Sequence, residues 1–307
     1  MRESIGGMTR ILVAGDDGLR TYDENGTPGP VDHEGRSVTA LAPDGDELWA
    51  VVEQTEIWRA GADGEWKHVA DLRDHAGTCI AVTDGPVVGT SEARLFRVND
   101  GGVEPVAAFD EIEQRSSWYT PWGGPPDTRS ISEWGPAVYV NVHVGGILLT
   151  EDGGESWRPT IDVDADVHQV ATAERLVLAA CAGGLASSGD RGATWTFRTD
   201  GLEAPYSRAV AVCGDSLLMS ASNGPRGARS AVYRGALTDG GFERCRTGLP
   251  EFFDDNVDTH CLDALPDGSF AAFGTSDGRV FASSDGGATW GDLATGLPPV
   301  RRVLVLR

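Results

Sequence analysis

Lysine is almost absent from this chain. Of the 25 basic residues only Lys67 is a lysine, whereas aspartate and glutamate number 47, and the formal net charge is −22. Such a chain lacks the cationic charge that drives binding to the phosphate backbone, so we expect no nucleic-acid partner.

Long apolar runs and paired cysteines are also missing. No stretch approaches the ~18 consecutive apolar residues of a membrane-spanning helix, and residues 1–8 have no apolar signal-peptide core. We therefore predict a cytoplasmic protein with no membrane partner. The five cysteines lack any CxxC spacing and lie in or beside apolar runs, so we expect them to be reduced and buried: Cys79, Cys181, Cys213, Cys245 and Cys261.

The sequence contains no phosphate-binding P-loop, no GxSxG nucleophile motif, no dinucleotide fingerprint and no HExxH zinc motif. These absences leave the question of enzymatic activity open.

Glycine is abundant, with 41 residues, and marks a repeated turn. The three copies are Thr150–Trp157, Ser188–Trp195 and Ser283–Trp290, each with a hydroxyl residue first, Asp third, Gly fifth, Ser or Thr seventh and Trp eighth. A short Asp side chain accepts hydrogen bonds from the turn's own N–H groups, and Gly permits φ > 0. The Trp is expected to pack between neighbouring units. The structural residues of these turns are Asp152, Trp157, Asp190, Trp195, Asp285 and Trp290.

The repeated turn resembles the Asp-box, or BNR, repeat of sialidases, sortilin-type receptors, xyloglucan-degrading enzymes and photosystem assembly factors. The resemblance implies a β-propeller in which the turn joins the third and fourth strands of a blade, on the face opposite the ligand site. The Asp-rich, nearly lysine-free composition is similar to that of halophilic archaeal proteins, with an acidic protein from a GC-rich mesophile as the alternative.

Short β-rich runs at nearly even spacing indicate how many blades there are. Seven of them, beginning with 11–15 and ending with 269–275, fit the second strand of a blade. The apolar run 300–307 has no blade of its own and would pair beside 11–15, which closes the ring and covers an open edge. We therefore predict an all-β fold, a single seven-bladed propeller over residues 1–307. The expected blades are 10–35 with 300–307, then 36–73, 74–115, 128–163, 166–204, 206–250 and 257–299.

Inner strands begin, and second strands end, on one face of a propeller, so residues at those positions should surround the channel mouth. Three of the six histidines occupy such positions: His143, His168 and His260. Imidazoles from separate strands, with Asp166 or Asp258 as a further ligand or supporting partner, lead to the hypothesis of one divalent transition metal. The alternative is that these histidines form hydrogen bonds across the mouth.

Arginines gather at the same positions. Arg129, Arg208 and either Arg301 or Arg302 would together bind an anionic group, because guanidinium forks pair with carboxylates. Sialidases hold a carboxylate with three arginines, but this sequence has no Arg-Ile-Pro motif and its repeats indicate seven blades rather than six. Pairing with surface carboxylates is the alternative for each arginine. Asn223 and Asp258 complete the expected ligand-binding set at the mouth.

The one long loop that breaks the rhythm, 116–132, contains Trp118, Tyr119 and Trp122. These rings would form a stacking platform for sugars above the mouth, or a plug over the channel. The leading hypothesis is a binding propeller for a small anionic molecule or carbohydrate, with monomer as the plausible state. A hydrolase acting on glycosides and a protein-assembly scaffold are the alternatives.

Overall fold

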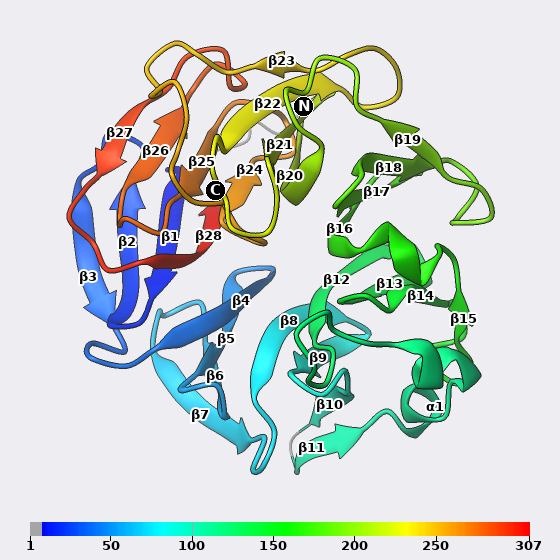
Figure 1. The fold of residues 1–307 in the computed structure, drawn as a ribbon. Coiled ribbons are helices and arrows are strands. Elements are labelled where there is room, and N and C mark those ends of the chain that lie inside the picture. The colour runs from blue at the N-terminus through cyan, green and yellow to red at the C-terminus, as the bar shows by residue number, and fades with distance from the viewer. Residues whose placement is uncertain (1–7, 100) are drawn as a thin grey trace, which may run out of the picture.

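The computed structural model describes residues 8–99 and 101–307, which form seven four-stranded antiparallel sheets around a central channel (Figure 1). This confirms the prediction of an all-β, seven-bladed propeller. The sequence analysis expected no apolar signal-peptide core in residues 1–8, and of these residues only Met8 lies within the described ranges.

Within each blade the strands follow one another from the channel outward. Blades one to three comprise β28 (Val300–Leu306), β1 (Arg10–Gly15), β2 (Gly18–Asp23) and β3 (Pro28–Asp32); β4 (Val38–Asp44), β5 (Glu47–Val52), β6 (Glu56–Ala60) and β7 (Trp66–Asp71); β8 (Gly77–Thr83), β9 (Gly85–Thr90), β10 (Leu95–Asn99) and β11 (Gly102–Pro105).

The other four blades repeat this order. They comprise β12 (Thr128–Trp134), β13 (Ala137–Val142), β14 (Gly146–Thr150) and β15 (Arg158–Pro159); β16 (Val167–Ala173), β17 (Leu176–Cys181), β18 (Gly184–Ser188) and β19 (Thr196–Arg198); β20 (Tyr206–Cys213), β21 (Ser216–Ser222), β22 (Ala231–Ala236) and β23 (Glu243–Arg244); β24 (Leu262–Ala264), β25 (Ala271–Gly274), β26 (Val280–Ser283) and β27 (Gly291–Ala294).

The ring is closed by strand β28, as the sequence predicts. It pairs antiparallel with β1, and the register places Arg10 opposite Leu306 and Val13 opposite Val303. Both strands are rich in β-branched and aliphatic side chains that bury against the adjoining blades. The two ends of the described chain are therefore neighbours in one sheet.

Seven apolar clusters, one between each pair of adjacent blades, make up the core. Each sheet buries both faces, so its inner strands are nearly continuous runs of small and branched apolar residues. The tryptophans of the repeated turns belong to these clusters: Trp157 packs between blades three and four, Trp195 between four and five, and Trp290 between six and seven.

The three repeated turns share one network of hydrogen bonds. In the turn after β18, the Ser188 hydroxyl accepts from Gly192 N at 2.7 Å, and Asp190 accepts from Thr194 N at 2.8 Å and from Thr194 Oγ1 at 2.6 Å. The turns after β14 and β26 repeat every one of these bonds. The fifth residue has positive φ in each copy, which explains the glycine there: Gly154, Gly192 and Gly287.

In the part of the chain that the structure describes, helix is confined to short connecting pieces: α1 (Ala107–Asp110), η1 (Glu113–Ser117) and η2 (Val163–Ala165). Within the described ranges no helix is long and apolar enough to cross a membrane. All five cysteines are free and buried, which confirms the expectation from their spacing.

Candidate metal centre

A β-bulge recurs at the mouth of the channel and aims side chains inward. In six of the seven blades the pairing of the first and second strands skips a residue at this end of the inner strand. The skipped residues are Thr39, Thr78, Arg129, His168, Arg208 with Ala209, and Arg301. Bulges re-aim side chains in this way beside functional sites. Five of these side chains line a cavity of about 430 Å³ at the mouth: Thr39, Thr78, Arg129, Arg208 and Arg301.

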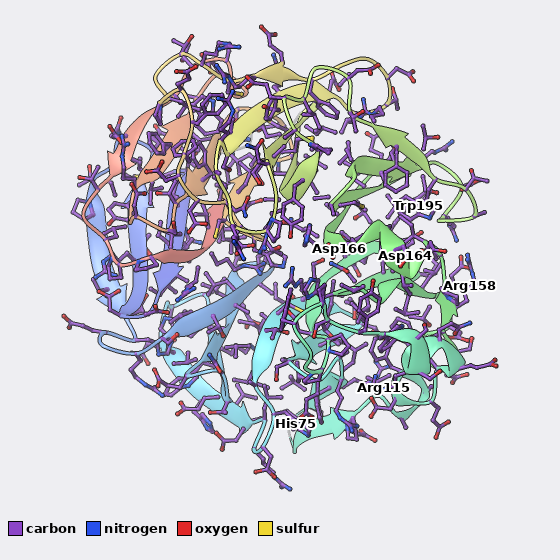
Figure 2. The ribbon with its side chains drawn as sticks, in the orientation of Figure 1. His75, Arg115, Arg158, Asp164, Asp166 and Trp195 are labelled. Atoms are coloured by element: carbon purple, nitrogen blue, oxygen red, sulfur yellow. The ribbon has the colours of Figure 1, made fainter. Side chains whose placement is uncertain are left out.

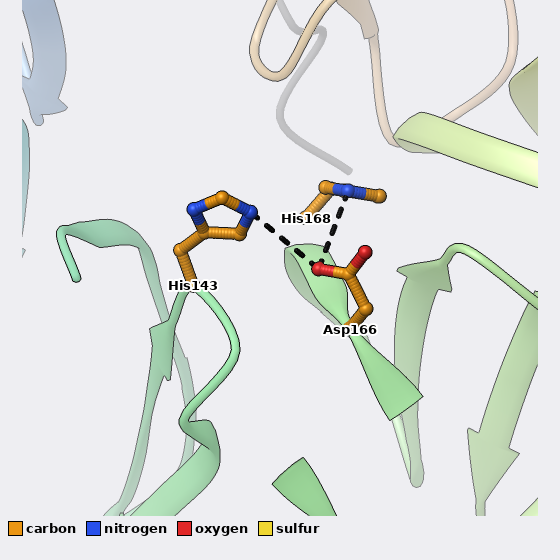
Figure 3. Close-up of side chains that lie close together, drawn as sticks. All are labelled: His143, Asp166 and His168. Carbon is orange, nitrogen blue, oxygen red and sulfur yellow. Dashed lines mark ion pairs between the residues drawn. The ribbon is translucent and has the colours of Figure 1, made fainter. Parts of the chain in front are cut away.

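The sixth bulged side chain, His168, belongs to a cluster between blades four and five (Figure 3). His143 follows the last residue of β13, and Asp166 immediately precedes β16. Asp166 has φ 46°, a left-handed conformation that Asp tolerates better than most residues, and it directs its carboxylate between the two imidazoles. Figure 2 places Asp166 toward the channel and Trp195 toward the rim of the ring.

One oxygen of Asp166 faces both imidazoles. Its Oδ1 lies 3.5 Å from His143 Nε2 and 3.6 Å from His168 Nε2, and one ligand atom from each of the three residues lies within 4.8 Å of the others. Two ligands held 2.0–2.1 Å from a tetrahedral zinc ion would stand about 3.4 Å apart. The distances from Asp166 to the two histidines therefore fit a small divalent metal ion.

The proton on His168 is fixed by its neighbour. His168 Nδ1 lies 2.6 Å from the carbonyl oxygen of Ser207, which can only accept, so Nδ1 carries the hydrogen. Burial, together with the charges of Arg129 and Arg208, lowers the pKa of His168 to about 3. The ring is consequently neutral, and a lone pair on Nε2 points toward Asp166.

Asp166 and His168 thus present two buried acceptors to each other. Neither Asp166 Oδ1 nor His168 Nε2 has a hydrogen-bond partner among the described residues. Buried polar atoms are nearly always satisfied, and two facing acceptors repel unless a proton or a cation lies between them. A metal ion would satisfy both atoms at once.

A second carboxylate lies beside His143. His143 Nδ1 lies 3.3 Å from Asp127 Oδ1, on the opposite side of the ring from Asp166, but the two atoms are not aligned as a hydrogen bond. Burial opposes ionisation of Asp127, but the contact with His143 and the charge of Arg129 outweigh it, so the pKa of Asp127 is below its ordinary value. An ionised Asp127 would accept a hydrogen from Nδ1 and leave Nε2 free as a ligand, which is the usual support for metal-binding histidines.

The local charge also suits a cation. Arg129 pairs with Asp127 at 3.1 Å, and Arg208 pairs with Asp258 at 2.9 Å. The three carboxylates around the cluster, Asp127, Asp166 and Asp258, outnumber these two guanidinium groups by one. A divalent ion would reverse the sign of this charge and create a site for an anion.

Comparison with known proteins supports the fold. The chain resembles the GH74 xyloglucanase of Xanthomonas campestris, with a TM-score of 0.70 and 17% identity, over 94% of this chain and 53% of the xyloglucanase, or about half its length. It also resembles YCF48 bound to D1 peptide, with a TM-score of 0.58 and 13% identity over 94% of this chain and 86% of YCF48. The WD40 repeats of RRP9 match with a TM-score of 0.61 and 12% identity over 86% of this chain and 82% of the RRP9 chain. No protein-family profile and no curated protein matches the sequence. At these identities the likeness shows the propeller fold alone.

Of the arginines expected at the mouth, Arg129, Arg208 and Arg301 line it, but each has a carboxylate partner. Arg302, the alternative to Arg301, is buried and is not among the residues that line the mouth cavity. Besides the pairs formed by Arg129 and Arg208, Arg301 makes a two-pronged contact with Asp16 at 3.0 and 3.1 Å. Arg129 Nη1 and Arg208 Nε are nevertheless buried without a partner. These two arginines therefore keep donors that a ligand would satisfy.

His260 lies apart from the His143 cluster. It has φ 62°, and its Nε2 contacts the carbonyl oxygen of Arg129 at 3.0 Å across the channel. Burial lowers the pKa of His260 well below its ordinary value. The hydrogen-bonded role that we expected as the alternative to metal ligation describes this histidine.

Some of the remaining residues of the expected binding set lie at the mouth and others do not. Asp258 lines the mouth beside Arg208, whereas Asn223 is exposed at the end of β21 and is not among the residues that line the mouth cavity. In the aromatic loop, Trp118 is 8% exposed and packs in the core against Phe109, while Trp122 is 66% exposed with its ring centre 5.0 Å from that of His143. Tyr119 is also exposed, so only Tyr119 and Trp122 are available as a rim.

Sequence reasoning missed Asp127 and the threonines Thr39 and Thr78 at the mouth. Asp127 directly precedes an inner strand, as Asp166 does, and that shared position was a usable signal. The threonines are placed by the bulges, which depend on how two strands pair and leave no mark on either strand alone.

Proposed function

We propose that this propeller binds one divalent transition metal through His143 Nε2, Asp166 Oδ1 and His168 Nε2. The main support for this proposal is that Asp166 Oδ1 and His168 Nε2 are buried acceptors without a hydrogen-bond partner among the described residues. The Ser207 carbonyl fixes the tautomer of His168 that leaves Nε2 as an acceptor. Two histidines and one carboxylate form a donor set used for zinc and for non-haem iron.

The bound ion would retain open coordination positions on the mouth side. We propose that they receive a small anionic molecule, whose carboxylate or similar group is also held by the free donors of Arg129 and Arg208. The exposed Trp122, beside His143, would cover the ligand. A carbohydrate acid fits this combination of metal, guanidinium groups and aromatic rim, so we propose this class of ligand.

The shared hydrogen-bond network of the three turns supports assigning the chain to the Asp-box propellers. Hydrolysis of glycosides by two free carboxylates is less well supported, because Asp16, Asp127 and Asp258 are each paired with an arginine. The geometry therefore favours metal-dependent binding over that chemistry, and over a scaffold that would leave the mouth unused.

The test is metal content. Untagged protein is stripped with a chelator, incubated with one equivalent of Zn²⁺ or Co²⁺, desalted and analysed by mass spectrometry. We expect about one ion per chain in the wild type, with a Co²⁺ visible spectrum of low coordination number. His143→Ala, His168→Ala and Asp166→Asn should each retain less than about a tenth as much, since loss of one of three ligands removes the site.

The matched control is His33→Ala, which removes a half-buried histidine that packs between Trp58 and Trp66, outside the cluster. This variant should bind metal as the wild type does. Equal metal in every variant, or none in the reconstituted wild type, would refute the site.

A further inference from the structure

The mouth cavity offers a ligand more than the two arginines of the proposed function. Its volume of about 430 Å³ falls in the range of about 300–1,000 Å³ that is usual for small-molecule sites. The candidate metal ligands His143, Asp166 and His168 are not among the residues that line it. A ligand held by Arg129 and Arg208 would therefore also contact side chains that metal binding does not use.

Three threonines from three blades line this cavity, and together we call them the threonine wall: Thr39 of blade two, Thr78 of blade three and Thr259, which precedes β24 of blade seven. Thr39 and Thr78 are the residues skipped at the β-bulges of their inner strands, so their side chains turn toward the channel. All three residues are half-buried, as a position in a cavity wall requires.

The hydroxyl hydrogens of the threonine wall are directed at the backbone. Each Oγ1 lies no more than 3.4 Å from two backbone carbonyl oxygens: those of Val51 and Gly77 for Thr39, of Gly89 and Thr128 for Thr78, and of His168 and Arg208 for Thr259. A carbonyl oxygen can only accept, whereas a hydroxyl group has one hydrogen and two lone pairs. The wall therefore presents hydrogen-bond acceptors, rather than donors, to the cavity.

The arginines of the cavity have the opposite property. Arg129 Nη1 and Arg208 Nε have no hydrogen-bond partner among the described residues. The cavity thus has acceptors on blades two and three, from Thr39 and Thr78, and free donors on blades four and six. A ligand that satisfies both sides has an anionic group at one end and hydrogen-bond donors at the other.

The charge of the cavity decides which donors fit the wall. The ionisable arginine and aspartate side chains that line it are three of the first kind and two of the second: Arg129, Arg208, Arg301, Asp127 and Asp258. This excess of positive charge disfavours an ammonium group. Neutral hydroxyl groups are then the donors that match the threonine wall.

We propose that the threonine wall makes the mouth selective for acids that carry several hydroxyl groups. The carboxylate lies at Arg129 and Arg208, and the hydroxyl groups donate to Thr39 and Thr78. This selectivity rests on the anion site of the proposed function but not on the metal ion. Its physical basis is that a site built to bind a hydroxyl group discriminates against an analogue that lacks it.

The first experiment compares ligands on the full chain. Titration calorimetry measures D-glucuronate and D-galacturonate against cyclohexanecarboxylate, which has a six-membered ring and a carboxylate but no hydroxyl group. The better of the two sugar acids should bind at least about tenfold more tightly. Equal affinities, or binding of neither class, would overturn the proposal.

The same titrations after treatment with a chelator separate this proposal from the metal site. A protein that holds no metal but keeps the selectivity refutes the metal site and supports the threonine wall. A metal-loaded protein without the selectivity does the reverse.

The second experiment removes single hydroxyl groups with little change of shape. Thr39→Val and Thr78→Val should each weaken binding of the sugar acid about three- to tenfold, as expected for one neutral hydrogen bond, and leave the affinity for cyclohexanecarboxylate unchanged. An equal loss for both kinds of acid would refute the assigned role. Should a variant fold poorly, the wild-type comparison of the acids still decides.

Thr172→Val is the matched control. Thr172 Oγ1 also donates to a carbonyl oxygen of a neighbouring blade, that of Glu133 at 2.6 Å, but Thr172 lines a second cavity of about 730 Å³ toward the opposite face. This variant should bind both kinds of acid as the wild type does. A selective loss of sugar-acid binding in Thr172→Val would show that the effect does not come from the mouth.

Discussion

The two faces of this propeller treat polar atoms in opposite ways. In the repeated turns the first hydroxyl and the Asp carboxylate are paired within eight consecutive residues, as Ser188 and Asp190 illustrate. At the channel mouth, acceptors on Asp166 and His168 and donors on Arg129 and Arg208 are buried without partners. Satisfied groups stabilise a fold, whereas buried unsatisfied ones are tolerated where a ligand completes them. The contrast teaches that the turns form the architecture, and it supports the proposal that the channel is the place for binding.

The largest effect that we expect is stabilisation of the folded protein by a metal ion bound at the channel mouth. Adding free Zn²⁺ at a thousandfold excess over its Kd should raise the free energy of unfolding of the stripped wild type by about 4 kcal/mol. Asp166→Asn should lose that gain, because its amide is a poorer ligand. Thermal unfolding in zinc buffers measures both; an equal gain in the variant would place the metal elsewhere.

The second largest effect is the pH dependence of stability that comes from the buried carboxyl group of Asp263. Burial raises the pKa of Asp263 from 3.8 to about 6, so the folded state binds a proton that the unfolded state has released. Stability therefore falls as pH rises from about 4 to 6. Asp263→Asn should be more stable than the wild type at pH 8, by up to about 3 kcal/mol, given about 1.4 kcal/mol per pKa unit.

The difference between Asp263→Asn and the wild type should disappear near about pH 3, where the wild-type carboxyl is protonated in both states. Denaturant unfolding at about pH 3 and pH 8 gives the comparison. A variant that is less stable at pH 8 would show that Asp263 is favourably paired.

A smaller effect is expected on the face of the turns. Ser188→Ala leaves the buried Gly192 N–H without its acceptor and should reduce the free energy of unfolding by about 1–3 kcal/mol. Its metal content should stay at the wild-type level. Ser187→Ala is the control, since that hydroxyl makes no hydrogen bond among the described residues. A similar loss of unfolding free energy in Ser187→Ala would show that the hydrogen bond from Gly192 N to Ser188 does not stabilise the turn.

The smallest effect should follow from Trp122→Ala. With 66% of Trp122 exposed, the free energy of unfolding should change by no more than about 0.5 kcal/mol, as for ordinary surface substitutions. Denaturant unfolding checks this. A loss of several kcal/mol would mean that the loop is part of the core rather than a rim over the site.

The fold was predictable because its signals are local. The spacing of Asp, Gly and Trp within each turn identifies a blade, and the apolar run that became β28 had no partner except the edge beside β1. Each of these inferences needed only consecutive residues and the rule that sheet edges are covered.

The candidate site was predictable only in part, because it depends on where chain segments meet. His143 and His168 were placed at the mouth by topology, and the structure brings them together with Asp166. His260 occupies a similar position in the sequence, but its positive φ and its contact with the Arg129 carbonyl set it in the middle of the channel. Trp118 entered the core because Phe109, from a helix that the sequence did not reveal, packs against it.

Strand β28 has a consequence for how the protein is assembled. The strand that closes the ring, Val300–Leu306, also carries Arg301 to the channel mouth. The contact between Arg301 and Asp16 spans 285 positions of the sequence, and contacts of such separation form late and slowly. Closure of the ring and completion of the channel wall are therefore one kinetic event, and a chain whose last strand has not docked has blades but no finished channel.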